Sequence, residues 1–178
     1  MKALLLAGGT GSRLFPVTLG VSKQLLPVYD KPMIYYPLST ILLAGIQEVL
    51  VICTPDDIAS YKRLLGDGTQ WGMQLSYKIH EYPRGLAEAF LLGEDFIGKD
   101  SVCLILGDNI FYGDGLVHLL KSANTNTNIS TAFCYRVSDP QNFGIMSFDE
   151  NNCPISVIEK PQHPSSDFAV TGMYFFDN

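Results

Sequence analysis

Short apolar runs alternate with helix-like segments along most of this chain, and the alternation constrains its fold more than any other feature. Six runs have the composition of buried strands: Ala3 to Leu6, Glu48 to Cys53, Gln74 to His80, Ser101 to Leu106, Ser130 to Val137 and Ala169 to Phe176. Four intervening segments have helical character: Pro37 to Ala44, Asp56 to Leu65, Gly85 to Ile97 and Gly115 to Ala123. We therefore expect an α/β protein, a Rossmann-like three-layer α/β/α sandwich with a mainly parallel, mixed sheet.

One segment departs from this alternation. Phe143 to Phe148 and Ile155 to Ile158 are apolar, and they flank the turn-forming residues Asp149 to Asn152. This pattern predicts a small β-hairpin insertion within residues 144–160. Neither an internal repeat nor an interdomain linker stands out, and 178 residues suffice for a substantial core. We therefore expect a single domain over residues 1–178.

The first apolar run leads directly into a loop that is rich in glycine and carries positive charge. The segment reads Leu6-Ala7-Gly8-Gly9-Thr10-Gly11-Ser12-Arg13-Leu14, and Ser22-Lys23-Gln24 follows it. Glycine allows positive φ angles and a close approach of the backbone to an anion, so amide N–H groups can form a phosphate cradle. A simple glycine turn after a buried strand is the alternative, but the two cations favour a site for a nucleoside triphosphate.

Leu14 distinguishes this loop from the dinucleotide-binding fingerprint. That fingerprint needs a small residue three places after its second glycine, where this chain has Leu14. The P-loop spacing that ends in Gly-Lys-Ser/Thr is also absent. A nicotinamide-linked oxidoreductase is therefore nearly excluded.

Asp108 is expected at the same edge of the sheet as the glycine loop. The loop from Gly8 to Arg13 follows the first strand, Pro83 and Gly85 follow the third, and Asp108 follows the fourth. Ligands bind outside the carboxyl ends of such strands. A carboxylate there suits Mg²⁺, which is usually held by one or two carboxylates plus substrate phosphates. The alternative role is a cap of the next turn; beside a phosphate loop, we favour the metal.

The charge balance restricts the partners of this protein. It has 12 basic and 18 acidic residues, a net charge of -6, which argues against a nucleic-acid or anionic membrane partner. No stretch approaches the roughly 20 apolar residues of a membrane span, and the first apolar run is too short for a signal peptide. The four cysteines form no Cys-x-x-Cys pair. We expect a cytoplasmic protein.

Histidine and serine residues do not indicate other chemistry. His118 and His163 have no Cys or His partner at metal-ligand spacing. Ser12, Ser22 and Ser39 have no nearby His-Asp arrangement, so no hydrolytic triad is expected.

Longer motifs extend through the whole chain: LLLAGGTGSRLFPVT, SKQLLPVYDKPMIYYPLSTILLAGI, LLGDGTQWGMQLSY, LGDNIFYG, EKP and VTGMYFFDN. The pattern AGG-x-G-x-RL alone marks only a superfamily, whereas SKQLLPVYDKPMIYYPLST is much more specific. With these motifs the chain resembles the bacterial glucose-1-phosphate thymidylyltransferases, members of the sugar nucleotidyltransferase superfamily.

The resemblance implies transfer of a nucleotidyl group from dTTP to glucose 1-phosphate, which yields dTDP-glucose and pyrophosphate for dTDP-rhamnose and other deoxysugars of bacterial polysaccharides. The catalytic residues that it implies are Arg13, Lys23 and Asp108, with Mg²⁺ on Asp108. The implied nucleotide-binding residues are Gly8, Gly9, Gly11, Ser12, Arg13, Gln24, His80, Pro83 and Gly85. The implied sugar-phosphate-binding residues are Asn109, Gly144, Glu159, Lys160 and Val170.

Both of these substrates are anions, so the protein must bring them together and neutralise charge rather than supply a covalent nucleophile. On this view Arg13 holds the triphosphate and Lys23 lies near the attacked phosphorus. The segment Glu159-Lys160-Pro161 is by itself more typical of an exposed charge pair. The resemblance assigns the sugar hydroxyls to Glu159 and the sugar phosphate to Lys160.

His80 leaves the base selectivity open. By the resemblance, this position reads the base and is usually Gln, whose amide donates and accepts hydrogen bonds at once. A neutral imidazole also has one donor and one acceptor, but on opposite sides of the ring. A UTP-dependent uridylyltransferase is therefore retained as an alternative.

The proteins that this chain resembles are longer than its 178 residues. The resemblance implies a further strand with a second metal-binding Asp, and C-terminal helices that help to build a homo-oligomer, typically a tetramer. We therefore interpret the chain as a fragment, or as one whose remainder is another chain, and expect weak or absent turnover. A nucleotide-sugar-binding module without catalysis is the second alternative.

Overall fold

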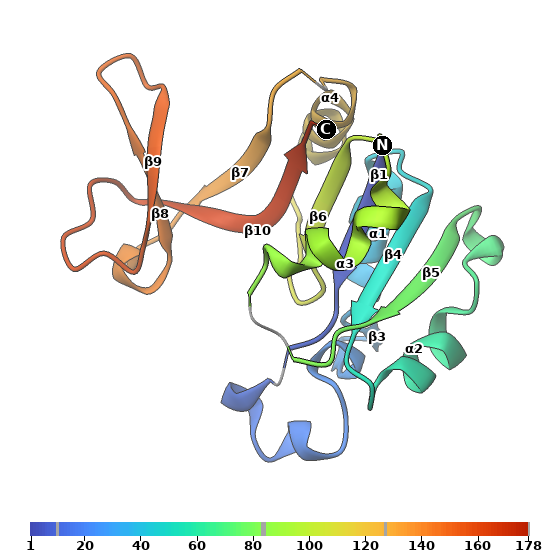
Figure 1. The fold of residues 1–178 in the computed structure, drawn as a ribbon. Coiled ribbons are helices and arrows are strands. Elements are labelled where there is room, and N and C mark those ends of the chain that lie inside the picture. Colours follow the sequence, from blue (N-terminus) through green and yellow to red (C-terminus); the bar gives the residue numbers. More distant parts are fainter. Residues whose placement is uncertain (10, 83–84, 127, 178) are drawn as a thin grey trace. The chain divides into compact units, whose positions relative to one another are not determined.

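A computed structural model describes residues 1–9, 11–82, 85–126 and 128–177 (Figure 1). The contacts within the chain divide it into two units. The first unit comprises Met1–Ser130 and the last residues from Phe175, and the second comprises Thr131–Tyr174. The single domain expected over residues 1–178 stays a prediction.

The first unit is built around a parallel sheet with the strand order β5-β4-β1-β6. Its strands are β1 (Lys2–Leu6), β4 (Glu48–Cys53), β5 (Gln74–Ile79) and β6 (Val102–Leu106). Leu4 of β1 pairs with Leu50 of β4 on one side and with Leu104 of β6 on the other. All three leucines are buried, as expected for continuous apolar strands that are covered on both faces.

Helices cover both faces of this parallel sheet. They are α1 (Tyr35–Leu43), α2 (Ile58–Leu65), α3 (Glu88–Ile97) and α4 (Leu116–Thr125). In Figure 1, α3 lies in front of the strands and α1 lies behind them; α3 packs on β1 and β4, and α1 packs on β1 and α4. The three-layer arrangement predicted from the sequence is thereby confirmed. Among the described residues, no helix combines the length and the apolar composition of a membrane span.

Short elements follow the glycine loop of the first unit. They are the 3₁₀ turns η1 (Ser12–Leu14), η2 (Val17–Leu19) and η3 (Lys23–Leu25), then β2 (Pro27–Val28), β3 (Lys31–Pro32) and, before β5, η4 (Thr69–Trp71). The N–H of Ile34 donates to the carbonyl of Gln24 at 2.9 Å, which anchors η3 to the start of α1. The sequence analysis missed these elements because segments of two or three residues are too short for hydrophobic periodicity.

The second unit consists of antiparallel strands. Its elements are β7 (Thr131–Arg136), η5 (Pro140–Asn142), β8 (Gly144–Phe148), β9 (Pro154–Glu159) and β10 (Phe168–Phe176), whose last residues belong to the first unit. Strands β8 and β9 pair with Ile145 opposite Ile158. In the turn, Asp149 Oδ1 accepts hydrogen bonds from the N–H groups of Asn151 and Cys153. The predicted hairpin and its turn are therefore confirmed.

Candidate functional site

The glycine loop begins at the carboxyl end of β1, and Gly11 packs tightly against the residues that follow it. Gly11 has a φ of 59°, and a Cβ there would lie 2.7 Å from Thr18 Cγ2 and 3.1 Å from Lys23 Cβ. Thr18 Oγ1 donates to the Gly11 carbonyl at 3.1 Å. A side chain at this position is therefore excluded both by the backbone angle and by the neighbours.

Positive side chains gather beside this loop. A cavity of about 320 Å³ is lined by Gly9, Gly11, Ser12, Arg13, Leu14, Lys23 and Asp108. The Arg13 side chain is exposed, so it is available to a ligand. The cavity thus brings together the two cations and the glycine backbone that the sequence analysis predicted to act on phosphate.

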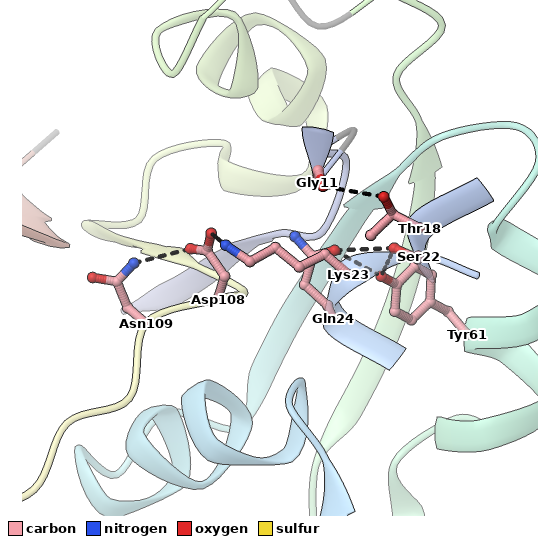
Figure 2. A network of polar contacts seen from close by, with 8 residues as sticks. All are labelled: Gly11, Thr18, Ser22, Lys23, Gln24, Tyr61, Asp108 and Asn109. Carbon is pink, nitrogen blue, oxygen red and sulfur yellow. Dashed lines mark hydrogen bonds and ion pairs between the residues drawn. The ribbon is translucent and has the colours of Figure 1, made fainter. Parts of the chain in front are cut away.

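Lys23 and Asp108 form an ion pair at the boundary of this cavity. Lys23 Nζ donates to Asp108 Oδ2 at 2.8 Å, and Asn109 Nδ2 donates to Asp108 Oδ1 at 3.0 Å (Figure 2). Burial acts to raise the pKa of Asp108, but the hydrogen bond and charge of Lys23 outweigh it, with help from Asn109. The pKa of Asp108 therefore lies below its ordinary value, and the carboxylate is ionised at neutral pH.

Gly107 allows Asp108 to lie close to the end of β1. The Gly107 N–H donates to the Leu6 carbonyl at 2.7 Å. A Cβ at Gly107 would lie 2.6 Å from that carbonyl oxygen and 3.2 Å from Gln24 Cγ. A side chain at position 107 would therefore collide with the backbone of β1.

A second cavity, of about 250 Å³, shares Gly9 and Asp108 with the first. Its lining consists of Leu6, Gly8, Gly9, Gln24, His80, Gly85, Leu86, Leu106 and Asp108. The leucines form apolar walls of the kind that accept a planar base, and Gln24 and His80 add hydrogen-bonding groups. Pro83, which was also predicted to bind nucleotide, lies outside the described residues. The two cavities therefore meet at Gly9 and at Asp108, the partner of Lys23.

His80 is paired with Glu88, a residue that the sequence analysis did not identify. His80 is only 6% exposed, and its Nε2 lies 2.8 Å from Glu88 Oε2. A carboxylate accepts hydrogen bonds, so Nε2 of His80 carries the proton. In the neutral ring, the other nitrogen, Nδ1, is then a hydrogen-bond acceptor. Glu88 lies in the first turn of α3, and its spacing of eight residues from His80 gave no signal.

The side-chain amide oxygen of Gln24 lies within hydrogen-bond distance of two hydroxyl groups. Its Oε1 lies 3.0 Å from Ser22 Oγ and 3.5 Å from Tyr61 Oη, and Tyr61 Oη also lies 3.2 Å from the Ala7 carbonyl (Figure 2). Gln24 is 3% exposed and Tyr61 is fully buried. The sequence analysis missed this network, because Tyr61 belongs to an amphipathic helix and its position is typical of a core residue.

The remaining predicted residues form a separate group in the second unit. Gly144 on β8 pairs with Glu159 at the end of β9, and Val170 lies on β10. Lys160 Nζ lies 3.6 Å from Glu159 Oε1, and both side chains are largely exposed. Lys160 has a φ of 46°, and its N–H donates to the Phe143 carbonyl at 2.9 Å. A non-glycine residue in this region is strained, which is common at functional positions.

Two other cavities of the first unit are less suited to phosphate. One, of about 500 Å³, borders Gly9 but includes Asp56 and Asp57 in its lining. Another, of about 480 Å³, includes Glu94, Asp100 and Asp177. Carboxylates in both linings would repel a triphosphate. Within the described residues, no cluster of three or more His, Cys, Asp or Glu side chains could hold a metal ion.

Comparison with known proteins finds relatives that match nearly the whole of this chain. A glucose-1-phosphate thymidylyltransferase of Neisseria meningitidis serogroup A is 59% identical over 178 residues, which are 100% of this chain and 62% of the relative. The protein of the same name from Xanthomonas campestris pv. campestris is 53% identical over 176 residues, 99% of this chain and 60% of the relative. The chain therefore spans about three fifths of the length of these relatives.

A solved structure supports the fold assignment. A Bacillus anthracis protein, described as a glucose-1-phosphate thymidylyltransferase in complex with sucrose, aligns with a TM-score of 0.91 and 36% sequence identity. The alignment covers 99% of this chain and 71% of that one. The family model described as nucleotidyl transferase matches residues 2–178. On this match and on the identities above, the chain belongs to the nucleotidyl transferase family.

Proposed function

We propose that this chain carries the nucleotide side, and part of the sugar-phosphate side, of a glucose-1-phosphate thymidylyltransferase. The observation that supports this most strongly is the Lys23–Asp108 pair, at 2.8 Å, because Asp108 lines both the glycine-lined cavity and the leucine-walled one. A triphosphate fits the first cavity by its charge and a base fits the second by its apolar walls. The names of the relatives that are 59% and 53% identical point to the same reaction.

The reaction joins two phosphates. A phosphate oxygen of glucose 1-phosphate attacks the α-phosphorus of dTTP, and the bond from that phosphorus to the bridging oxygen of the β-phosphate breaks. Pyrophosphate leaves with the electron pair, and dTDP-glucose forms. In this proposal Arg13 binds the triphosphate and the departing pyrophosphate, and Lys23 neutralises charge at the attacked phosphorus.

Asp108 fits a magnesium ion that is bound largely by substrate. Mg²⁺ is typically held by one or two carboxylates plus phosphate oxygens and water, rather than by a cage of protein ligands. The ionised, half-buried carboxylate of Asp108 beside the phosphate cavity meets this requirement. When bound, the metal would neutralise charge that develops on the phosphate oxygens.

The second unit would supply the sugar-phosphate side. We assign the sugar phosphate to Lys160 and the sugar hydroxyls to Glu159. We also assign sugar-phosphate binding to Gly144 and Val170 and, in the first unit, to Asn109. The exposed ends of Glu159 and Lys160 are free to approach a ligand. The proposal also includes a homo-oligomer in the cytoplasm, as the resemblance implies.

His80 bears on the choice between dTTP and UTP. With Nε2 bound to Glu88, the neutral ring has an acceptor at its other nitrogen, which matches the N3–H that thymine and uracil share. His80 therefore does not separate the two bases by itself. We favour dTTP because of the names of the relatives, and titration with dTTP and UTP side by side checks this choice.

The test measures dTTP affinity and pyrophosphate release by the purified chain with Mg²⁺ and glucose 1-phosphate. Lys23→Met should weaken dTTP binding roughly 10-fold or more, because a charge-assisted contact is lost. Lys99→Met is the matched control, since exposed Lys99 precedes β6 at the opposite edge of the sheet. Equal losses in both variants, or no dTTP binding by the wild type, would contradict the proposal. Stabilisation by dTDP-glucose without pyrophosphate release would favour the binding module.

A further inference from the structure

The hydroxyl group of Tyr61 lies behind the candidate nucleotide site, where it joins three segments of the first unit. Tyr61 is on α2 and is fully buried. Its Oη lies 2.8 Å from Ser22 Oγ, 3.2 Å from the Ala7 carbonyl oxygen and 3.5 Å from Gln24 Oε1. The phenol therefore connects α2 with the end of β1 and with the turn that begins η3.

The hydrogen-bond donors in this cluster can be assigned by counting protons. Ser22 Oγ donates its one proton to Gln24 Oε1 at 3.0 Å. The 2.8 Å contact between Ser22 and Tyr61 then needs the proton of Tyr61, for which Ser22 Oγ is a nearer acceptor than the Ala7 carbonyl at 3.2 Å or Gln24 Oε1 at 3.5 Å. Burial raises the pKa of Tyr61, so the phenol keeps that proton at neutral pH. The result is a series of hydrogen bonds from Tyr61 through Ser22 to Gln24, in which each bond strengthens the next.

This series of hydrogen bonds determines which end of the Gln24 amide faces the cavity. The oxygen of Gln24 is turned toward the two hydroxyl groups (Figure 2). Its nitrogen, Nε2, lies 3.7 Å from the point that a Cβ on Gly9 would occupy. Both residues line the cavity of about 250 Å³. A ligand in this cavity therefore meets the NH₂ group of Gln24, which only donates hydrogen bonds.

We propose that Tyr61 is a positioning residue that fixes the Gln24 amide so that only its N–H donors face the bound nucleotide. This inference rests on the proposed function. The ligand atom is an oxygen acceptor, on a phosphate or on the base. Without the Tyr61 proton, Ser22 can turn and accept a hydrogen bond from Gln24 Nε2. The amide is then free to rotate and to present its own oxygen to the ligand oxygen, which is repulsive.

A double-mutant cycle on dTTP affinity tests this inference. Tyr61→Phe keeps the buried ring and should weaken dTTP binding roughly 5-fold, because one ligand hydrogen bond is lost in part of the molecules. In a Gln24→Ala background, Tyr61→Phe should cause no further loss. Tyr77→Phe is the matched control, since the Tyr77 hydroxyl donates to the Gly66 carbonyl at 2.6 Å in the same unit.

Two results would overturn the inference: dTTP affinity that Tyr61→Phe leaves unchanged, or an equal loss in the Gln24→Ala background, which would indicate a general structural effect. Parallel titrations with thymidine and with inorganic triphosphate locate the acceptor. If Gln24 contacts the base, Tyr61→Phe weakens thymidine binding; if it contacts a phosphate, the variant weakens triphosphate binding. A variant that weakens neither would count against the inference.

A second variant tests the inference if Tyr61→Phe fails to fold, and a second readout tests it if the proposed function is wrong. Ser22→Ala should give the same loss as Tyr61→Phe, without additivity, and it replaces Tyr61→Phe if that variant fails to fold by circular dichroism. If the wild type binds no dTTP, the proposed function fails. A nuclear Overhauser contact between the Gln24 NH₂ and Gly9 then still tests the positioning. It should be present in the wild type and lost in Tyr61→Phe, and its absence from the wild type would overturn the inference.

Discussion

Two ion pairs, one in each unit, contain the same types of group but are built differently. Lys23 and Asp108 lie 2.8 Å apart, and their side chains are 29% and 30% exposed. Lys160 and Glu159 lie 3.6 Å apart, and their side chains are 58% and 72% exposed. The first pair is fixed by its surroundings before any ligand arrives, whereas the second is a loose contact in solvent.

The difference extends to the backbone beneath each pair. Asp108 follows a glycine that touches the backbone of β1, so its position is set by the centre of the sheet. Lys160 follows β9, a strand whose residues are all exposed. Preorganised groups stabilise developing charge without rearrangement, whereas exposed pairs contribute little until a ligand orders them. We infer that the pair in the first unit is positioned before its substrate binds, whereas the pair in the second unit is not.

The largest predicted effect concerns the charge of Asp108. Asp108→Asn should weaken binding of dTTP with Mg²⁺ roughly 30-fold, as expected for a loss of about 2 kcal/mol. Without Mg²⁺ the same variant should bind dTTP as well as the wild type or better, because a repelling carboxylate is removed and Lys23 is released. Calorimetric titration with Mg²⁺ and with a chelator measures both effects.

The matched control for Asp108→Asn is Asp100→Asn. Asp100 also pairs with a lysine, Lys2, at 3.0 Å, and it belongs to the same unit. It should leave dTTP affinity unchanged under both conditions. Equal weakening by Asp108→Asn with and without Mg²⁺ would mean that the carboxylate only holds Lys23 in place.

The same glycine substitution should have different effects in the two units. A Cβ at Gly107 would lie 2.6 Å from the Leu6 carbonyl oxygen, which is backbone and cannot move aside. At Gly144 it would lie 3.1 Å from Glu159 Oε2, the end of a flexible side chain. Gly107→Ala should therefore lower the free energy of unfolding by about 1 to 3 kcal/mol, whereas Gly144→Ala should change it little. Chemical denaturation measures both, and equal losses would contradict the comparison.

Two substitutions of Lys160 separate the effect of backbone strain on stability from the effect of its charge on ligand binding. Lys160→Gly and Lys160→Ala remove the same charge, but only glycine accepts a φ of 46° without cost. The glycine variant should be the more stable of the two by about 1 kcal/mol. Both should lose affinity for glucose 1-phosphate to the same extent. Thermal unfolding and ligand titration check this, and an alanine variant of equal or greater stability would show that no strain is relieved.

The smallest predicted effect is the pH dependence that Asp108 confers. Its pKa is lowered in the folded protein, so its stabilising contribution is present at neutral pH. The contribution is lost as the pH falls below the ordinary value of about 4 toward the lowered pKa. The stability difference between wild type and Asp108→Asn should therefore shrink in acid. Acid denaturation of the two proteins measures this difference, and a difference that stays constant as the pH falls would contradict the prediction.

Much of the fold could be predicted from the sequence because its strands are buried on both faces. Strand β4 has the predicted bounds, and β1 and β6 differ from their predicted bounds by one residue each at the start. The hairpin of β8 and β9 also agrees, because Asp149 and its neighbours favour a turn strongly. Periodicity and turn chemistry are local properties, and they were sufficient for these elements.

The supporting residues of the site could not be predicted in the same way. Glu88 contacts His80 and Tyr61 contacts Ser22, although neither pair is close in sequence. Such contacts depend on how α2 and α3 pack on the sheet, and an ordinary helical tyrosine or glutamate gives no sign of them. The glycine loop and Asp108 were identified because they directly follow buried strands, at the edge of the sheet where ligands bind.

The central claim is that the first unit holds the nucleoside triphosphate in a site formed before binding. A titration of the ¹⁵N-labelled chain with dTTP and Mg²⁺, followed by the amide resonances of each residue, tests it most directly. We predict saturable shifts at Gly9, Gly11 and Asp108, and unchanged resonances along β9 until glucose 1-phosphate is added. Shifts that begin on β9 with dTTP alone, or no shifts in the glycine loop, would contradict the claim.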